Sequence, residues 1–489
     1  MKIEYIKKHA ALFLAIVMSG TVFAGCQKKE AEKELSVRHK EITETEDDRL
    51  TPPETLEDED DDWEEDEDEE DDYVEPEKKY INVFTYTDDV NYMVQEYKKL
   101  HPDLEYEFMM TNIATDNGGY QQALDACLYY GDEDAPDIFV VGSDFAWDYI
   151  NGEQSDYAAS YDEMGIDMQN KPYDAKIAPY TYETGTRLSD GQVVALSYMD
   201  SSCFMIYRAD IAMEVFGTDD PEEISDIFGG NSGSLDKFFE AAENLKSKGY
   251  AAISGPDDLW YLVNGSTSSS WLVDGEFNIS KERDSFFDIS KTIADNDYSN
   301  MNNMWNSGWY DDMGGKGDRQ VFAFFGPQWF LDYMLTEYSH DTYGNWRITD
   351  APINSYEYQT WIMPSIYASE ADPEKKDVIK DFLEWVTLDT SETGYQYLAA
   401  TGSLDSSGSM MSVPSAVVME KIDYESDFLG GQNPFEYYIS SSQDTHAYPL
   451  SKNDDKYGSA FMQVAEQYAE GELDRDQSIE QFLEMASGI

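Results

Sequence analysis

The sequence predicts an α/β fold, because short apolar strands alternate with amphipathic helices from residue 80 onwards. A first apolar run begins at Tyr80, and the apolar residues that follow recur at helical spacing until His101-Pro102 ends the helix. Next come an alternating run over residues 104–108, a helical pattern over 120–130 and a third apolar run over 137–142. Strand, helix, strand, helix, strand is the order of a parallel sheet covered by helices.

Residues 1–25 precede this region and have the pattern of a secretion signal. Lys2, Lys7 and Lys8 form a basic start, and the apolar run that follows is shorter than the ~20 residues that a membrane-spanning helix needs. The stretch Val22-Phe23-Ala24-Gly25-Cys26 resembles the end of a bacterial lipoprotein signal. This resemblance implies cleavage before Cys26 and lipidation of its thiol with a diacylglycerol group. The alternative is an ordinary signal peptide followed by a chance cysteine.

Residues 26–79 predict a disordered acidic stalk between the anchor and the globular part. From Glu57 to Asp72 every residue except Trp63 is Asp or Glu, and repulsion between like charges keeps such a run extended. A calcium-binding tail is the alternative. The run has no glycine with which to fold a calcium loop, so we favour the stalk.

The composition excludes one class of partner. The chain carries 101 acidic and 33 basic residues, a formal net charge of −68, and the acidity extends into the globular part. Such a field repels phosphate backbones, so nucleic-acid binding is not expected. Cys127 and Cys203 are the other two cysteines. They are either buried thiols or, outside the cytoplasm, a disulfide.

Four pieces of the chain, in order, resemble the family of extracellular solute-binding proteins that deliver sugars to ABC importers. They are residues 97–106 (YKKLHPDLEY), 131–139 (GDEDAPDIF), 206–217 with 234–250, and 323–329 (AFFGPQW) with 377–388 and 400–404. The chain departs from the family in its insertions, its stalk and Phe324-Phe325, where relatives often have a methionine.

The resemblance implies a two-lobed periplasmic-binding-protein-like fold, in which each lobe is a mainly parallel sheet flanked by helices and a hinge joins the lobes. The expected first lobe is about 80–195 with a returning segment near 320–375. The second is about 205–318 with the C-terminal helices. The apolar runs 193–196 and 204–207 are the candidate crossings, and the ligand is expected in the cleft between the lobes.

The strand pattern itself places one wall of that cleft. Open parallel sheets bind ligands beyond the carboxyl ends of their strands. Tyr86 and Asp88 follow the first predicted strand, and Asp144 follows the third. These three side chains are therefore predicted ligand contacts.

Aromatic side chains supply the other candidates. Sugar rings present apolar C–H faces that stack on aromatic faces, and hydroxyls that need polar partners. The chain has 36 Tyr and 10 Trp, and several lie beside polar residues in stretches of weak periodicity. In the family pattern the position of Trp329 lies in the cleft. Each of these aromatics has packing in the core as its alternative role. The candidates are Trp147, Trp260, Trp271, Trp305, Trp309, Asp311, Trp329 and Trp361.

Catalytic patterns are poorly represented. No Gly-x-Ser-x-Gly, His-Glu-x-x-His or phosphate-binding Gly-Lys-Ser/Thr motif occurs, and His101, His340 and His446 of the globular part are scattered. A glycosidase needs only two carboxylates, so motifs alone do not exclude one. No enzyme activity, cofactor or metal is predicted.

The sequence thus favours a monomeric, lipid-anchored receptor on the extracellular face of the bacterial cell membrane. It would capture a carbohydrate, an oligosaccharide in particular, and pass it to the permease subunits of an ABC importer. Two alternatives stay open. One is a receptor for a cationic solute such as a polyamine, and the other is a surface glycosidase or adhesin.

Overall fold

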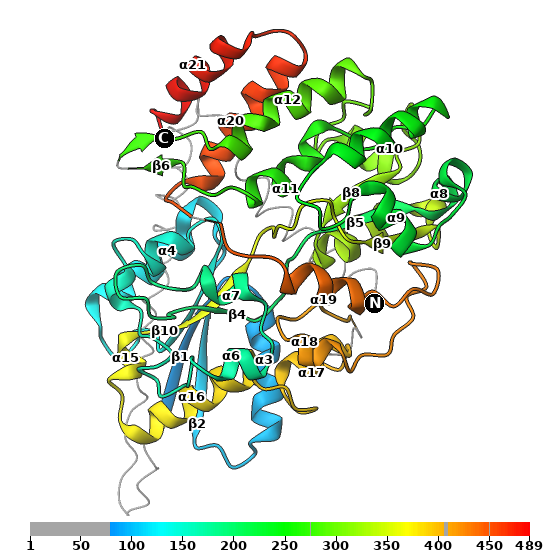
Figure 1. Cartoon of the computed structure of the whole chain (residues 1–489). Coiled ribbons are helices and arrows are strands. Elements are labelled where there is room, and N and C mark those ends of the chain that lie inside the picture. Colours follow the sequence, from blue (N-terminus) through cyan, green and yellow to red (C-terminus); the bar gives the residue numbers. More distant parts are fainter. Residues whose placement is uncertain (1–78, 274, 405–408, 449) are drawn as a thin grey trace, which may run out of the picture.

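A computed structural model describes residues 79–273, 275–404, 409–448 and 450–489. Two separate sheets form the centres of two lobes, which Figure 1 shows in the lower and upper halves of the molecule. The predicted signal peptide, Cys26 and almost all of the predicted stalk lie outside the described residues. The two-lobed α/β fold is confirmed.

The first lobe is built on a five-stranded sheet of order β2-β1-β3-β10-β4. Strand β1 pairs in parallel with β2 and β3, as the alternation of strands and helices predicts, whereas β10 is antiparallel to β3 and β4. The strands are β1 (Lys79–Thr85), β2 (Tyr106–Asn112), β3 (Ile138–Gly142), β4 (Leu196–Ser197) and β10 (Thr360–Pro364).

Helices cover both faces of this sheet (Figure 1). They are α3 (Asp89–Leu100), α4 (Gly119–Tyr130), α5 (Ala146–Ile150), α6 (Lys171–Asp174), α7 (Pro179–Glu183), α15 (Ile366–Ser369), α16 (Pro373–Thr387) and the short η1 (Asp116–Gly118) and η2 (Ser155–Tyr157). Helix α3 buries Val90, Met93, Val94 and Tyr97, the apolar face that its sequence predicts. The Tyr97 ring packs 5.1 Å from that of Phe382 on α16, so α3 and α16 share one core.

Helix α16 is also held to the sheet by a buried ion pair. Lys375 Nζ lies 2.8 Å from Asp137 Oδ2, and the Asp137 side chain, just before β3, is only 2% exposed. The backbone N–H of Asn82 on β1 donates to the same carboxylate oxygen at 2.8 Å. One aspartate therefore joins β1, β3 and α16.

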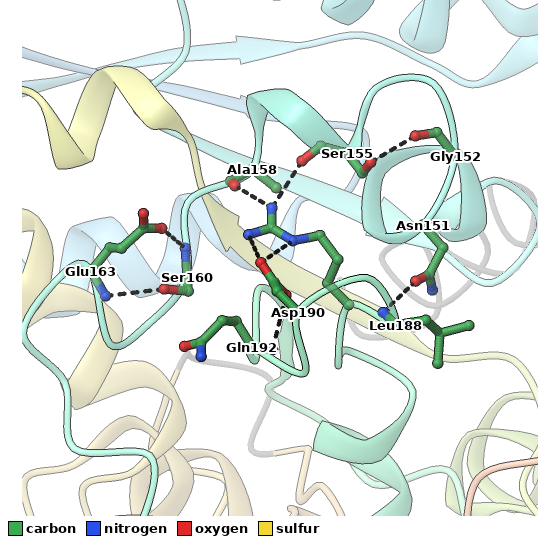
Figure 2. A network of polar contacts seen from close by, with 10 residues as sticks. Asn151, Gly152, Ser155, Ala158, Ser160, Glu163, Leu188, Asp190 and Gln192 are labelled. Atoms are coloured by element: carbon green, nitrogen blue, oxygen red, sulfur yellow. Dashed lines mark hydrogen bonds and ion pairs between the residues drawn. The ribbon is translucent and has the colours of Figure 1, made fainter.

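A second polar network orders the chain before it leaves the first lobe (Figure 2). The guanidinium of Arg187 donates to Asp190 and to the carbonyl oxygens of Ser155 and Ala158 at 2.7–3.1 Å. Asn151 Oδ1 accepts the backbone N–H of Leu188 at 2.8 Å. These contacts fix the turn 187–192 against the loop after α5.

The second lobe contains a three-stranded sheet of order β8-β5-β9, in which β5 (Phe204–Arg208) is antiparallel to both β8 (Ala323–Gly326) and β9 (Trp346–Thr349). Parallel pairing appears here only as isolated bridges, at Ala251–Val321 and Ile253–Ser299. The expectation of a mainly parallel sheet therefore holds for the first lobe and not for the second.

The strand pairing also moves a predicted boundary. Residues 323–349, expected to return to the first lobe, instead supply β8 and β9 of the second sheet, and the chain returns only at β10. Apolar runs reveal strands but not their partners, since all these strands are buried on both faces.

The remaining elements surround the second sheet or lie beside the connections between lobes. Helix α20 packs on both α12 and α21 at the top of Figure 1. The elements are α8 (Ala209–Phe216), α9 (Pro221–Phe228), α10 (Asp236–Ser247), η3 (Pro256–Leu259), α11 (Trp260–Gly265), β6 (Leu272–Val273), β7 (Glu276–Phe277), α12 (Lys281–Asp295), α13 (Ser307–Met313), η4 (Phe330–Leu335), α14 (Thr336–Tyr338), η5 (His340–Thr342), α17 (Tyr395–Ala400), α18 (Ala416–Met419), α19 (Phe435–Gln443), α20 (Asp454–Ala469) and α21 (Arg475–Ala486).

Two chain segments cross between the sheets side by side. They are residues 198–203, from β4 to β5, and 350–359, from β9 to β10. Cys203 N donates to Ser355 O at 2.9 Å and Glu357 N to Ser201 O at 3.0 Å. We call this pair the crossing ribbon. The candidate crossings 193–196 and 204–207 flank its first segment.

Candidate ligand cleft

Three segments of the first lobe meet where β1 and β3 end. Tyr86 follows β1, Asp144 follows β3, and Tyr358 precedes β10. The Tyr86 hydroxyl lies 3.3 Å from the Tyr358 hydroxyl, which donates to Asp144 Oδ1 at 3.4 Å. The structure thus brings the predicted residues Tyr86 and Asp144 together. Tyr86 is buried and supports Tyr358, whose ring is half-buried.

Asp88, the third predicted residue of this edge, is exposed on the loop between β1 and α3. Its Oδ1 accepts a hydrogen bond from Asn112 Nδ2 at 3.1 Å. Asp88 therefore lies at the same strand end as Tyr86, at the rim of the sheet.

A narrow pocket separates Asp144 from the start of α20. Its volume is about 40 Å³, and it is lined by Ser143, Asp144, Phe145, Trp147, Asp148, Leu450, Ser451, Lys452, Asn453, Asp454 and Asp455. The first five residues belong to the first lobe and the others lead into α20 of the second. Because its lining comes from both lobes, this pocket lies between them, and the predicted residue Trp147 is part of its wall.

The carboxyl groups of this pocket are held in a partly desolvated position. Asp144 keeps contact with solvent, but the protein that surrounds it and the nearby charge of Asp455 raise its pKa to about 7. Desolvation by the surrounding protein likewise raises the pKa of the half-buried Asp454 to about 6 and that of Asp455, which is exposed, above its usual range. The site therefore disfavours the charged form of three neighbouring carboxyls.

The second lobe contributes Asp257 of η3 and Tyr261 of α11. Asp257 Oδ2 accepts the backbone N–H of Met304 at 2.6 Å, while its Oδ1 is buried without a hydrogen-bond partner among the described residues. Burial raises the pKa of Asp257 to about 7. Its neighbour Asp258 serves the core instead, because it accepts hydrogen bonds from Trp309 Nε1 and Ser254 N at 2.9 Å.

Glu357 lies on the crossing ribbon, between the two walls. Its side chain is 6% exposed, and burial raises its pKa to about 8. Burial, followed by the charges of Glu357, Asp455 and Asp257, raises the pKa of the Tyr261 hydroxyl well above its usual value. Helix α11, which carries Tyr261, contacts both other segments, since Trp260 stacks on Phe461 of α20 and Gly265 lies against Ser355 of the crossing ribbon. We call Tyr261, Glu357, Asp257 and Asp455 the acidic centre.

A larger pocket of about 240 Å³ lies between η4 and the segments 409–410, 424–429 and 434–438. Gln328 Nε2 donates to Asp332 and to Met410 O, the latter at 3.1 Å, and so links η4 to the segment before α18. Asp332 is exposed at this pocket, and desolvation by the protein around it raises its pKa to about 7. The lining is rich in aromatic rings and consists of Leu331, Asp332, Tyr333, Thr336, Ser409, Met410, Tyr424, Ser426, Leu429, Pro434, Phe435 and Tyr438.

Five of the predicted tryptophans are core residues in this structure. Trp271, Trp309 and Trp361 expose no surface, and Trp260 and Trp329 expose 2% and 3%. Trp361 Nε1 donates to Thr181 O at 3.0 Å, and the Trp260 ring stacks on Phe461 at 5.4 Å. These five side chains offer no face to a ligand here, so we leave them out of the proposed site. Composition alone cannot separate a buried indole from a binding one.

Trp147 and Trp305 are the predicted tryptophans that keep part of their surface exposed. Trp305 adopts a positive φ of 68°, an uncommon conformation for a large side chain, and its ring lies 5.2 Å from that of buried Trp309. The predicted Asp311 is exposed on α13, whereas its neighbour Asp312 is buried and accepts a hydrogen bond from Ser254 Oγ at 2.6 Å.

The sequence analysis missed Asp257, Tyr261, Glu357, Tyr358 and Asp455. The available signals were the aromatic stretch Tyr358-Gln359-Thr360-Trp361 on one wall and the pair Asp257-Asp258 before Trp260 on the other. No periodicity or motif connects these residues, because they meet only in the folded chain.

Two kinds of site are absent from the described ranges. No cluster of three or more His, Cys, Asp or Glu side chains there is placed to hold a metal ion, and none of their helices is long and apolar enough to cross a membrane. Cys127 and Cys203 are both free thiols, so the disulfide that the sequence left open is not formed.

Comparison with known proteins places the fold. No family model and no curated protein matches the sequence. Among solved structures, an extracellular solute-binding protein of family 1 superposes with a TM-score of 0.66 at 12% identity, over 84% of this chain and 99% of the other.

Two further structures carry the names of sugar-binding proteins. A sugar transporter from Rhizobium etli in an open conformation gives a TM-score of 0.60 at 17% identity, over 84% and 99% of the two chains. The cyclic α-maltosyl-1,6-maltose-binding protein of Arthrobacter globiformis gives 0.57 at 13%, over 83% and 97%. The chain therefore has the two-lobed fold of the family 1 extracellular solute-binding proteins.

Proposed function

We propose that this protein captures a carbohydrate, and an oligosaccharide in particular, between its two lobes and presents it to an ABC importer. The observation that carries the proposal is the combination of half-buried aromatic rings and carboxyl groups at the pocket between the lobes, which Trp147 and Asp144 line, and on nearby segments. Trp147, Trp305, Tyr261 and Tyr358 are the rings, and Asp144 and Asp257 are the nearest carboxyl groups. Structures of the same fold that bind sugars support it.

The chemistry of such a site is binding without reaction. Aromatic rings contact the apolar faces of the sugar, and carboxyl oxygens accept hydrogen bonds from its hydroxyls. Asp257 Oδ1, which is buried without a hydrogen-bond partner in the described chain, is the clearest acceptor for a ligand hydroxyl or amine. Rotation of the lobes toward each other would enclose the ligand.

A ligand screen tests this proposal. Neutral oligosaccharides should raise the melting temperature of the protein, and the Trp305→Ala variant should bind the active sugar at least several-fold more weakly, because it loses a stacking surface of ~0.5–1.5 kcal/mol. Tyr173→Ala is the matched control, since Tyr173 is 84% exposed on α6. If no saccharide raises the melting temperature, or Trp305→Ala binds as the parent does, the proposal fails. Incubation with sugars should yield no cleavage products.

We also propose that the protein is a monomer anchored by lipid at Cys26 on the extracellular face of the membrane, as the leader sequence indicates. Cys26→Ser should appear in the soluble fraction or keep its leader, because the lipid has lost its thiol. Persistence of a processed Cys26→Ser protein in the membrane fraction would contradict the anchor.

A further inference from the structure

The acidic centre combines carboxyl groups from three segments that are distant in the sequence. Glu357 comes from the crossing ribbon, Asp257 from η3 of the second lobe, and Asp455 from the first turn of α20. Each is close enough to Tyr261 for its charge to raise the pKa of that hydroxyl, after the larger effect of burial. The segment η3–α11, which carries Asp257 and Tyr261, packs on α20 through Trp260 and Phe461 and lies against the crossing ribbon where Gly265 meets Ser355, so the three segments adjoin.

These carboxyl groups have vacant bonding capacity. The Glu357 side chain is 6% exposed, and burial alone shifts the pKa of its carboxyl, with no hydrogen bond or ion pair to a described residue. Asp257 Oδ1 is buried and likewise without a hydrogen-bond partner within the described ranges. Buried polar groups are nearly always paired, because an unpaired one has lost its hydration without replacement.

Two basic side chains of the surrounding segments have other partners, although Arg283 Nη2 is buried without a hydrogen-bond partner in the described chain. Arg283, buried on α12, donates to Asn264 Oδ1 at 2.9 Å and to Ser269 O at 3.0 Å, and its guanidinium carbon lies 3.9 Å from the Trp271 ring centroid. Lys452 pairs with Asp148 at 3.1 Å. The described residues therefore bring no cation to Glu357 or Asp257.

We infer that the acidic centre binds a cationic amine of the ligand, so that the transported carbohydrate is an amino sugar or an oligosaccharide that contains one. An ammonium group would donate hydrogen bonds to Glu357 and Asp257, and the Tyr261 ring adds a cation–π contact. This inference rests on the proposed carbohydrate function. The half-buried rings of Trp305 and Tyr358 remain available for the sugar faces.

Matched ligands separate the inference from the proposed function. The probes are short glucosamine oligomers, their N-acetylated counterparts, neutral glucose oligomers of the same linkage, and spermidine, each titrated against the full chain. Glucosamine oligomers should bind at least tenfold more tightly than both uncharged series. Equal binding of the uncharged series would overturn the inference and leave the carbohydrate function standing. Binding of spermidine alone, or of none of the probes, would overturn both.

Isosteric variants locate the amine. Glu357→Gln and Asp257→Asn should each lower the affinity for glucosamine oligomers about tenfold. The affinity for any neutral oligosaccharide should stay unchanged, because each variant removes only a charge. Glu472→Gln, an exposed change beyond the end of α20, is the control. The melting temperature of unliganded Glu357→Gln should equal or exceed that of the parent. If Glu357→Gln lowers the affinity for charged and neutral sugars equally, the carboxyl does not recognise an amine, and the inference is wrong.

Discussion

Individual tryptophans show how one residue type takes two roles. Trp271 lies in a Gly/Ser-rich stretch of the sequence, yet its ring is fully buried among Phe461, Phe482 and the Arg283 guanidinium. Trp305 comes from an equally polar stretch and remains half-buried. The difference arises from tertiary packing, so it has to be tested by stability and by binding together.

Truncation of Trp271 should therefore damage the fold and not the site. Trp271→Ala should lower the free energy of unfolding by ~3–5 kcal/mol, because a large buried ring leaves a cavity. Trp305→Ala should lower the free energy of unfolding less than Trp271→Ala does, and it should lower the ligand affinity more. Urea unfolding and ligand titration of both variants measure the two effects. A Trp271→Ala protein with parental stability and reduced affinity would place that ring in the site.

Glu357 also makes a prediction about pH. In the folded protein its pKa is about 8, whereas an unfolded glutamate titrates near ~4.3. Between these values the folded state binds more protons than the unfolded state, so this group's contribution to stability decreases as pH rises from ~5 to ~8.

Chemical unfolding at both ends of that window tests the sign. Glu357→Gln should lose less stability than the parent between ~pH 5 and ~pH 8, because an amide does not titrate. An identical loss in both proteins would mean that Glu357 is already ionised in the folded state.

At the scale of elements, one ion pair of α16 reaches a buried partner, Asp137. Lys375→Met should lower the free energy of unfolding by up to ~3–5 kcal/mol, because Asp137 would remain buried without its cation. The double variant Asp137→Asn/Lys375→Met should recover part of this loss. Lys380→Met on the same helix is the control, since Lys380 has no ion pair in the described chain. We expect Lys375→Met to lower the free energy of unfolding more than Lys380→Met does. Equal losses in the two variants would contradict a specific role of the Lys375–Asp137 pair.

Elements that form locally were predictable from the sequence, and their distant partners were not. The alternation from β1 to β3 was confirmed because each helix and strand carries its own periodicity. The assignment of β8 and β9 to the first lobe was wrong, because pairing with β5 joins strands more than a hundred residues apart. The residues of the site were likewise predictable where they depend on local structure and not where they depend on distant partners. Tyr86 and Asp144 follow strand ends that the sequence shows, whereas Glu357 and Asp257 meet only through the fold.

For the whole molecule, ligand binding should stabilise and compact the protein. A ligand that binds only the folded state, at a hundredfold excess over its Kd, should raise the free energy of unfolding by about 2.7 kcal/mol. Closure of the lobes should also reduce the radius of gyration in small-angle X-ray scattering. Stabilisation with an unchanged radius of gyration would indicate that the ligand binds one lobe without closure.

The crossing ribbon has a mechanical consequence. Its two segments are hydrogen-bonded side by side, and Tyr180 and Ser412 each donate a hydrogen bond to Asp200 within it at 2.6 Å. Two bonded segments resist sliding and stretching more than bending, so we expect the lobes to turn about an axis through the ribbon. Displacement then grows with distance from that axis. Residues of the acidic centre would move little, whereas α21, at the far end of the second lobe in Figure 1, would undergo the largest displacement.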